Sequence, residues 1–284
     1  MRLRVAAFAL LLAAPLTGRA QDRVENLGGR EVTVWEPKSK VAAPIVLFSH
    51  GFGGCPTQST FLAKALADNG YWVFAPRHVD ARCGGRGIAG SRPEEPFRNP
   101  EKWTDTTYRD RRDDFRVVEA ALRGDARYRG RADFTRVAYV GHSLGGYTVL
   151  GLAGAWPSWT SQPPKAVVAF SPYVAPFIQA NTLGKLRAPV MYQGGTLDFG
   201  ITPTLVGPKG AYELSSLPKY LAVLPRGGHL AWTDLRPDLH KTIVVYTLSF
   251  LDHYVRGSPA TLQLLEGGAE LASYRYDAEI GKRP

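Results

Sequence analysis

Six short and nearly continuous apolar runs recur along the chain. They lie at Pro44–Ser49, Tyr71–Ala75, Arg136–Val140, Ala166–Phe170, Pro189–Gln193 and Lys219–Leu224. Apolar runs of this length are typical of strands that are buried on both faces of a sheet. We therefore predict that these six runs form the core strands of the fold.

Amphipathic stretches separate the apolar runs and predict helices. The first stretch places its apolar side chains on one helical face and ends at Gly70, a common helix stop. The predicted helices are Gln58–Asn69, Tyr108–Leu122, Leu144–Ala155 and Asp238–Val255. Strands that alternate with helices indicate right-handed βαβ units. The predicted class is therefore α/β, with helices on both faces of a mostly parallel central sheet.

Three segments lie outside this alternation. Arg23–Leu27 and Arg30–Trp35 flank two glycines, a pattern that predicts an antiparallel hairpin with a two-residue turn. Val79–Thr107 is rich in Gly, Pro and Arg and has no period. Long loops in compact domains are usually functional, so we expect this one to cross the active face. Ser258–Pro284 supports no prediction.

The first 20 residues, MRLRVAAFALLLAAPLTGRA, have the layout of an export signal. Arg2 and Arg4 precede an apolar run, and Gly18 and Ala20 are the small residues that signal peptidase reads. We predict a signal peptide over residues 1–20 and a single domain over residues 21–284. The run is short for a membrane span, although an uncleaved anchor stays an alternative. The mature protein is expected to be periplasmic or secreted, without a membrane anchor.

The composition excludes a mainly disordered chain. Of 284 residues, 44% are hydrophobic and 21% are charged, which is enough apolar material for a sizeable core. The net charge of +10 becomes +7 once the three arginines of the signal are removed. The cations are scattered, and acidic residues interrupt their densest run, Arg109–Asp114. We interpret that run as a solvated helix face and expect no nucleic-acid partner.

The chain has two cysteines, Cys55 and Cys83, each in a loop that follows a predicted strand. If those strands are neighbours, the two loops share one edge of the sheet and a disulfide is geometrically allowed. The sequence leaves this pairing open. Neither cysteine has a histidine or cysteine at ligand spacing, so we expect no zinc site.

The sequence around Ser143 has the form G-x-S-x-G. Gly141-His142-Ser143-Leu144-Gly145 follows a predicted strand and precedes a predicted helix, which is the context that such a nucleophile turn requires. The sharp turn exposes the serine hydroxyl, and only glycine at positions 141 and 145 leaves room for the neighbouring chain. Ser143 is therefore the predicted nucleophile.

A serine nucleophile needs a base and a group that orients the base. In sheet enzymes with this turn, the acid and then the histidine follow the serine along the chain. Asp198 and His229 fit this order, since each lies just past a predicted strand. His78 is the rival base, and Asp80 and Asp234 are rival acids.

A glycine-rich loop, Ser49-His50-Gly51-Phe52-Gly53-Gly54, follows the first core strand. Acyl transfer places negative charge on the carbonyl oxygen, and fixed N–H groups must bind that oxyanion. We expect the backbone N–H groups of Phe52 and Leu144 to be these donors.

Together these motifs resemble the α/β-hydrolase superfamily. The similarity is strongest to exported dienelactone-hydrolase-like esterases, a group that includes chlorophyllase-like and platelet-activating-factor-acetylhydrolase-like enzymes. The resemblance implies the α/β-hydrolase fold, a triad of Ser143, Asp198 and His229, and no cofactor. True dienelactone hydrolases use a cysteine nucleophile, whereas position 143 is serine, so ester hydrolysis is the inferred activity.

The expected substrate is a small or short-acyl apolar ester, because no long amphipathic lid helix is evident. Trp103 and Trp232 are candidate pocket residues, although tryptophans are more often core residues. Alternatives are a thioesterase, amidase or polyester hydrolase with the same triad, or a secreted binding protein without activity.

Overall fold

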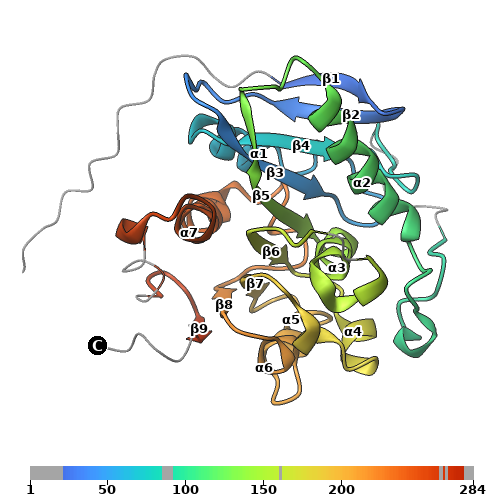
Figure 1. Ribbon diagram of the computed structural model, residues 1–284. Coiled ribbons are helices and arrows are strands. Elements are labelled where there is room, and N and C mark those ends of the chain that lie inside the picture. The colour runs from blue at the N-terminus through green and yellow to red at the C-terminus, as the bar shows by residue number, and fades with distance from the viewer. Residues whose placement is uncertain (1–21, 85–91, 160–161, 262–264, 266–267, 278–284) are drawn as a thin grey trace, which may run out of the picture.

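The computed structural model describes residues 22–84, 92–159, 162–261, 265 and 268–277, and within them nine strands form one sheet (Figure 1). The strands are β1 Asp22–Leu27, β2 Arg30–Trp35, β3 Ala43–Ser49, β4 Trp72–Pro76, β5 Ala132–His142, β6 Ala166–Phe170, β7 Val190–Gly195, β8 Lys219–Leu224 and β9 Ser273–Asp277. Their order is β1-β2-β4-β3-β5-β6-β7-β8-β9. The strands from β4 to β8 run parallel, and β1, β2 and β9 are antiparallel at the edges.

The apolar runs are continuous because both faces of the sheet are covered. In β5, Val137 and Tyr139 pack into one hydrophobic core, whereas Ala138 and Val140 pack into the other. Successive side chains of a strand point to opposite faces, so a strand between two cores needs apolar residues at every position. All six predicted core strands are present, and the predicted α/β class is confirmed.

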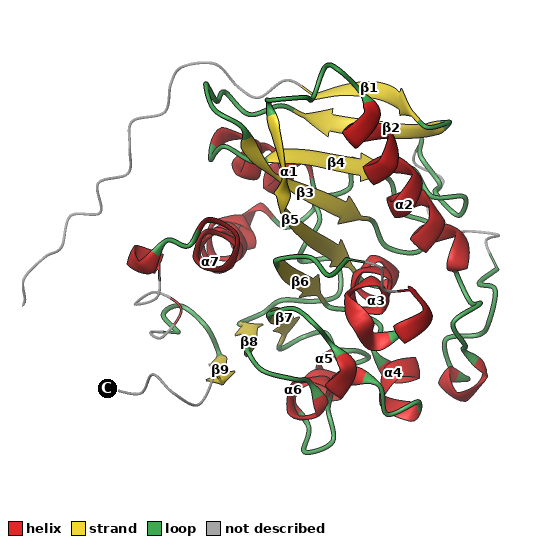
Figure 2. Ribbon diagram, viewed as in Figure 1, coloured by secondary structure: helices red, strands yellow, loops and turns green. Residues whose placement is uncertain are grey.

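Helices lie on both faces of the sheet (Figure 2). Their bounds are α1 Thr60–Asp68, α2 Arg109–Gly124, α3 Leu144–Leu150, α4 Ala175–Gln179, α5 Thr202–Val206, α6 Ala211–Leu214 and α7 Pro237–Arg256. Buried residues of α1 and α7 share one core, and those of α2 to α6 share the other. None of the helices within the described residues is long and apolar enough to cross a membrane.

Several elements differ from the sequence-based expectation, which did not include the short helices α4, α5 and α6. The helix predicted over Leu144–Ala155 is regular only to Leu150, and a π-helical turn, η2, covers Gly151–Ala155. The helix does not continue past η2, because Gly154 has a φ of 128°, which is not helical. Strand β9 was not predicted, because it lies at the sheet edge and lacks an apolar run.

The run Arg109–Asp114 is not a fully solvated face, so that interpretation was wrong in part. Arg111 and Asp114 are buried, with exposed fractions of 0% and 2%. Each is neutralised by an ion pair, Arg111 with Asp80 and Asp114 with Arg30. The alternating charges of this run therefore do not show that Arg111 and Asp114 face inward.

The long irregular segment crosses the active face where it is described. The hydroxyl of Tyr147, in α3, donates to the carbonyl oxygen of Thr107 at 3.0 Å, and the hydroxyl of Tyr173 donates to that of Phe97 at 2.6 Å. Tyr147 follows Ser143 by four residues, and the backbone N–H of Tyr173 donates to the carbonyl oxygen of Ser143 at 3.1 Å. The export signal expected over residues 1–20 lies outside the described residues and stays a prediction.

Candidate active site

Ser143 occupies a strained turn between β5, which ends at His142, and α3, which begins at Leu144. Its backbone has φ 55° and ψ −117°, a region that residues other than glycine rarely adopt. Backbone hydrogen bonds to the end of β6 and to the segment that follows it hold this turn. The N–H of Ser143 donates to the carbonyl oxygen of Phe170 at 2.9 Å, and its own carbonyl accepts from Tyr173 at 3.1 Å.

Glycine is required on both sides of this turn because other backbone segments pass close by. A Cβ atom at Gly145 would overlap the carbonyl oxygen of Ser49, and one at Gly141 would overlap the carbonyl oxygen of Gly145. The spacing of the motif therefore follows from close backbone packing between β3, β5 and α3.

The structure brings Ser143, His229 and Asp198 together from three separate loops. His229 follows β8 and Asp198 follows β7, so both lie at the carboxyl ends of parallel strands, as Ser143 does. Nε2 of His229 lies 2.9 Å from Oγ of Ser143, and its Nδ1 lies 3.3 Å from Oδ2 of Asp198. This is the hydrogen-bonded order that a serine nucleophile, its base and an orienting acid require.

A second serine, Ser171, joins this group and was not foreseen. It follows β6, is fully buried and has a φ of 40°. Its Oγ lies 2.8 Å from Nδ1 of His229 and is also hydrogen-bonded to Oδ2 of Asp198. The sequence offers only a weak signal for it, namely a hydroxyl directly after a strand that ends at the active edge.

The Asp198 carboxylate is suited to remain charged. Burial on its own would raise the pKa of Asp198, but hydrogen bonds from His229 and Ser171 outweigh burial and lower it. The side chain of Asp198 is 4% exposed, whereas that of His229 is 38% exposed. A buried anion thus supports a histidine that a substrate can reach.

Of the two residues expected to supply oxyanion donors, Leu144 directly follows Ser143, and Phe52 directly follows a residue that packs against Ser143. Leu144 is the first residue of α3, where backbone N–H groups have no partner within the helix. Phe52 follows Gly51, at which a Cβ atom would lie 3.4 Å from Cβ of Ser143. Within the described part of the chain, neither N–H donates a hydrogen bond.

A chain of hydrogen bonds connects the glycine-rich loop to the histidine loop. The N–H of Gly51 donates to Oε1 of Gln58 at 3.1 Å, and Nε2 of Gln58 lies 3.0 Å from Nδ1 of His142. Nε2 of His142 then lies 2.8 Å from the carbonyl oxygen of His229. Burial, followed by His229, lowers the pKa of His142 to about 3, so this ring is neutral and can both accept and donate.

The rival residues have other partners. His78 is fully buried, with Nε2 2.9 Å from Oγ of Ser49 and Nδ1 2.8 Å from Oδ2 of Asp114. The carboxylate of Asp80 binds a guanidinium, and that of Asp234 accepts a backbone N–H at the start of α1. None of the three is positioned as a partner of the Ser143 hydroxyl.

The two candidate pocket tryptophans are core residues in the structure, which corrects that expectation. Trp232 is 0% exposed and stacks near Phe170, and Trp103 is 4% exposed within a cluster of aromatic rings. Their large apolar surfaces are buried by packing and are not available to line an open pocket. Exposed apolar side chains occur instead at Leu197, Phe199 and Leu230, which are sequence neighbours of Asp198 and His229.

A sequence model of the alpha/beta hydrolase family matches residues 46–278, which is most of the chain and includes every residue of this site. The chain belongs to the alpha/beta hydrolase family. Curated proteins yield no significant match to this alpha/beta hydrolase. Within its described residues, no group of three or more His, Cys, Asp or Glu side chains is arranged to hold a metal ion.

Proposed function

We propose that this alpha/beta hydrolase is a serine esterase with Ser143 as nucleophile, His229 as base and Asp198 as orienting acid. One observation carries the proposal: Oγ of Ser143 lies 2.9 Å from Nε2 of His229. This hydrogen bond gives the hydroxyl a base in direct reach. Family membership supports hydrolysis, and the serine at position 143 favours esters.

The proposed reaction has two stages. Nε2 of His229 takes the Ser143 proton as Oγ attacks the ester carbonyl, and the N–H groups of Phe52 and Leu144 bind the resulting oxyanion. The imidazolium then protonates the leaving alcohol, which leaves an acyl group on Ser143. In the second stage His229 activates water, the acyl group is released as an acid and the serine is restored.

The proposed substrate is a small, apolar ester. Leu197 and Phe199 flank Asp198, and Leu230 follows His229, and all three side chains are more than half exposed. The N–H of Leu197 donates to the carbonyl oxygen of Gly227, which joins the acid loop to the histidine loop. Apolar side chains on these joined loops favour an apolar acyl or alcohol group. Placement among dienelactone-hydrolase-like esterases is part of this proposal.

The test is hydrolysis of p-nitrophenyl acetate by the purified protein and by Ser143→Ala. We expect Ser143→Ala to lose at least about a thousandfold in kcat and to lose labelling by a fluorophosphonate. Ser39→Ala, at an exposed serine, is the control and should keep full activity. Activity retained by a folded Ser143→Ala variant would refute the proposal, and a wild-type protein that no fluorophosphonate labels would point to a binding protein.

Specificity and export need their own measurements. Matched esters, thioesters and anilides with one acyl group, together with a polyester film, separate the esterase from its alternatives. We also propose that residues 1–20 direct export with cleavage after Ala20. To test this, activity is measured in the periplasm and the medium, and the N-terminus of the active chain is sequenced. We expect the N-terminus to be Gln21.

A further inference from the structure

A buried cation contacts the loop that carries Phe52. The side chain of Arg111, in the first turn of α2, is 0% exposed. Its guanidinium donates to the carbonyl oxygen of His50 at 2.7 Å and to that of Gly51 at 3.3 Å. A buried charge is costly unless its donors are satisfied, so the conformation of these two residues is tied to the guanidinium.

Asp80 binds both Arg111 and the same loop. Its carboxylate binds Arg111 through two contacts, Oδ1 to Nε at 3.0 Å and Oδ2 to Nη2 at 2.7 Å. Oδ2 also accepts the N–H of Gly53 at 3.0 Å. Burial would raise the pKa of Asp80, but Arg111 outweighs burial and lowers it to about 2, so the pair is ionic at neutral pH.

These contacts set the direction of the N–H group of Phe52. The carbonyl oxygen of Gly51 accepts from Arg111 and also from the N–H of Gly54 at 3.0 Å. In a trans peptide the C=O and the following N–H point in opposite directions. With the Gly51 carbonyl directed at the guanidinium, the N–H of Phe52 points away from Arg111.

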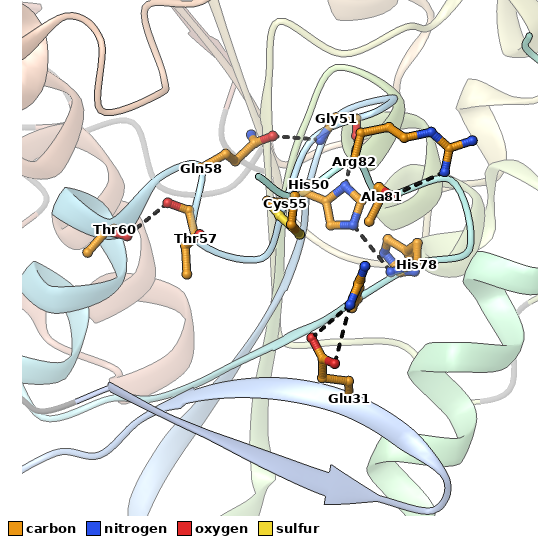
Figure 3. The surroundings of a disulfide bond; sticks show 12 residues. Glu31, His50, Gly51, Cys55, Thr57, Gln58, Thr60, His78, Ala81 and Arg82 are labelled. Carbon is orange, nitrogen blue, oxygen red and sulfur yellow. Dashed lines mark hydrogen bonds and ion pairs between the residues drawn. A yellow bond between two sulfur atoms is a disulfide. The ribbon is translucent and has the colours of Figure 1, made fainter. Parts of the chain in front are cut away.

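A covalent link brings Asp80 to this position. Cys55, just after the loop, forms a disulfide with Cys83, and their Cα atoms are 5.5 Å apart. The N–H of Arg82 donates to the carbonyl oxygen of Gly54 at 3.1 Å. Figure 3 shows the two segments side by side at the disulfide, with His50 directed at His78.

We propose that Arg111 and Asp80 are positioning residues for the oxyanion site: the buried ion pair fixes Gly51–Gly53 so that the N–H of Phe52 faces the oxygen formed at Ser143. The inference rests on the proposed function. Neither side chain touches the substrate, and both act through the loop backbone.

The experiment compares Asp80→Asn and Arg111→Met with the wild type. Arg116→Met is the matched control, because Arg116 lies on the same helix but is exposed and donates to Trp159. The readouts are kcat/KM for p-nitrophenyl acetate and the inhibition constant of an aryl trifluoromethyl ketone. The ketone adds to a serine hydroxyl and leaves an alkoxide in the oxyanion site. Its inhibition constant does not depend on the fraction of folded enzyme, so misfolding cannot imitate the effect.

We expect Asp80→Asn to lower kcat/KM about 10-fold to 100-fold and to raise the inhibition constant of the ketone by the same factor. KM should stay within twofold of the wild type. Loss of a whole oxyanion donor costs about 10²–10³, so a misdirected donor should cost less. Arg111→Met should show an equal or larger loss, and Arg116→Met none. Asp80→Asn keeps the side-chain shape, so it decides the matter if Arg111→Met does not fold.

The outcomes separate the two proposals. If the wild type neither hydrolyses the ester nor reacts with a fluorophosphonate, the proposed function fails. If the wild type is active and Ser143→Ala is not, but folded Asp80→Asn keeps wild-type kcat/KM and ketone affinity, only the positioning role is overturned.

Discussion

Oγ of Ser171 lies 2.8 Å from Nδ1 of His229, closer to it than Oδ2 of Asp198 at 3.3 Å. The hydroxyl also hydrogen-bonds to Asp198. The hydroxyl oxygen can therefore accept a hydrogen bond from the N–H at Nδ1 while the hydroxyl donates a hydrogen bond to the carboxylate. The proposed acid acts on the histidine both directly and through a serine.

Removal of this hydroxyl should slow the reaction. We predict that Ser171→Ala lowers kcat/KM by about 10- to 150-fold, the equivalent of one hydrogen bond to a charged group. In the Asp198→Asn background the same change should have little further effect, because the two residues act on one nitrogen. Ser249→Ala, which removes a serine hydroxyl on α7, is the control. Additive losses in the double variant would contradict a shared role.

The turn at Ser143 should not tolerate a methyl group. We predict that Gly145→Ala lowers the free energy of unfolding by about 2 kcal/mol or more, because the new Cβ would overlap the Ser49 carbonyl. Gly124→Ala is the matched control, since Gly124 ends α2 and a Cβ there meets nothing within 4 Å. Urea unfolding of both variants measures the difference, and equal stabilities would disprove the packing argument.

Acid should destabilise the protein through three buried histidines. Burial lowers the pKa values of His50, His78 and His142 below their ordinary value of 6.5, in the last case to about 3. As the pH falls below 6.5, the unfolded chain binds protons at these positions that the folded chain does not. Stability present above that pH is lost, by up to about 4 kcal/mol per pH unit for three protons.

Urea unfolding between pH 7 and pH 5 tests this acid sensitivity. We expect His142→Gln to reduce the pH slope by about 1.4 kcal/mol per pH unit, the value for one proton. A variant with the same slope as the wild type would show that His142 takes up its proton in the folded protein.

The disulfide should contribute measurably to stability. Cys55 and Cys83 are separated by 28 residues, and closing a loop of that length stabilises a fold by about 3–4 kcal/mol in the chain-entropy account. We predict a loss of that size for the Cys55→Ala/Cys83→Ala double variant. Wild-type protein unfolded in dithiothreitol should match it. A change below about 1 kcal/mol would be inconsistent with this estimate.

The core strands and the triad candidates could be predicted because they depend on local patterns. Each apolar run directly reflects burial on two faces, and the turn at Ser143 needs glycines at fixed spacing. Asp198 and His229 then follow from the rule that parallel strands present their carboxyl ends at one edge. The family match supports this fold, while the roles of the residues still need the tests above.

The residues that hold the site in place could not be predicted in this way. Ser171 lies at the end of a strand, and Arg111 lies on a helix whose sequence is polar. Only the tertiary fold brings them to the site. The pocket expectation for Trp103 and Trp232 was wrong because the sequence around a tryptophan does not show whether its ring faces the solvent or the core. Burial of a polar or aromatic side chain is decided by tertiary packing.

Strand β9 pairs with Lys219–Val223 of β8, the strand that leads to His229. Without Ser273–Asp277, the N–H and C=O groups along that side of β8 would form an open edge, a template for pairing between molecules. A recombinant version shortened before residue 273 is therefore at risk of aggregating.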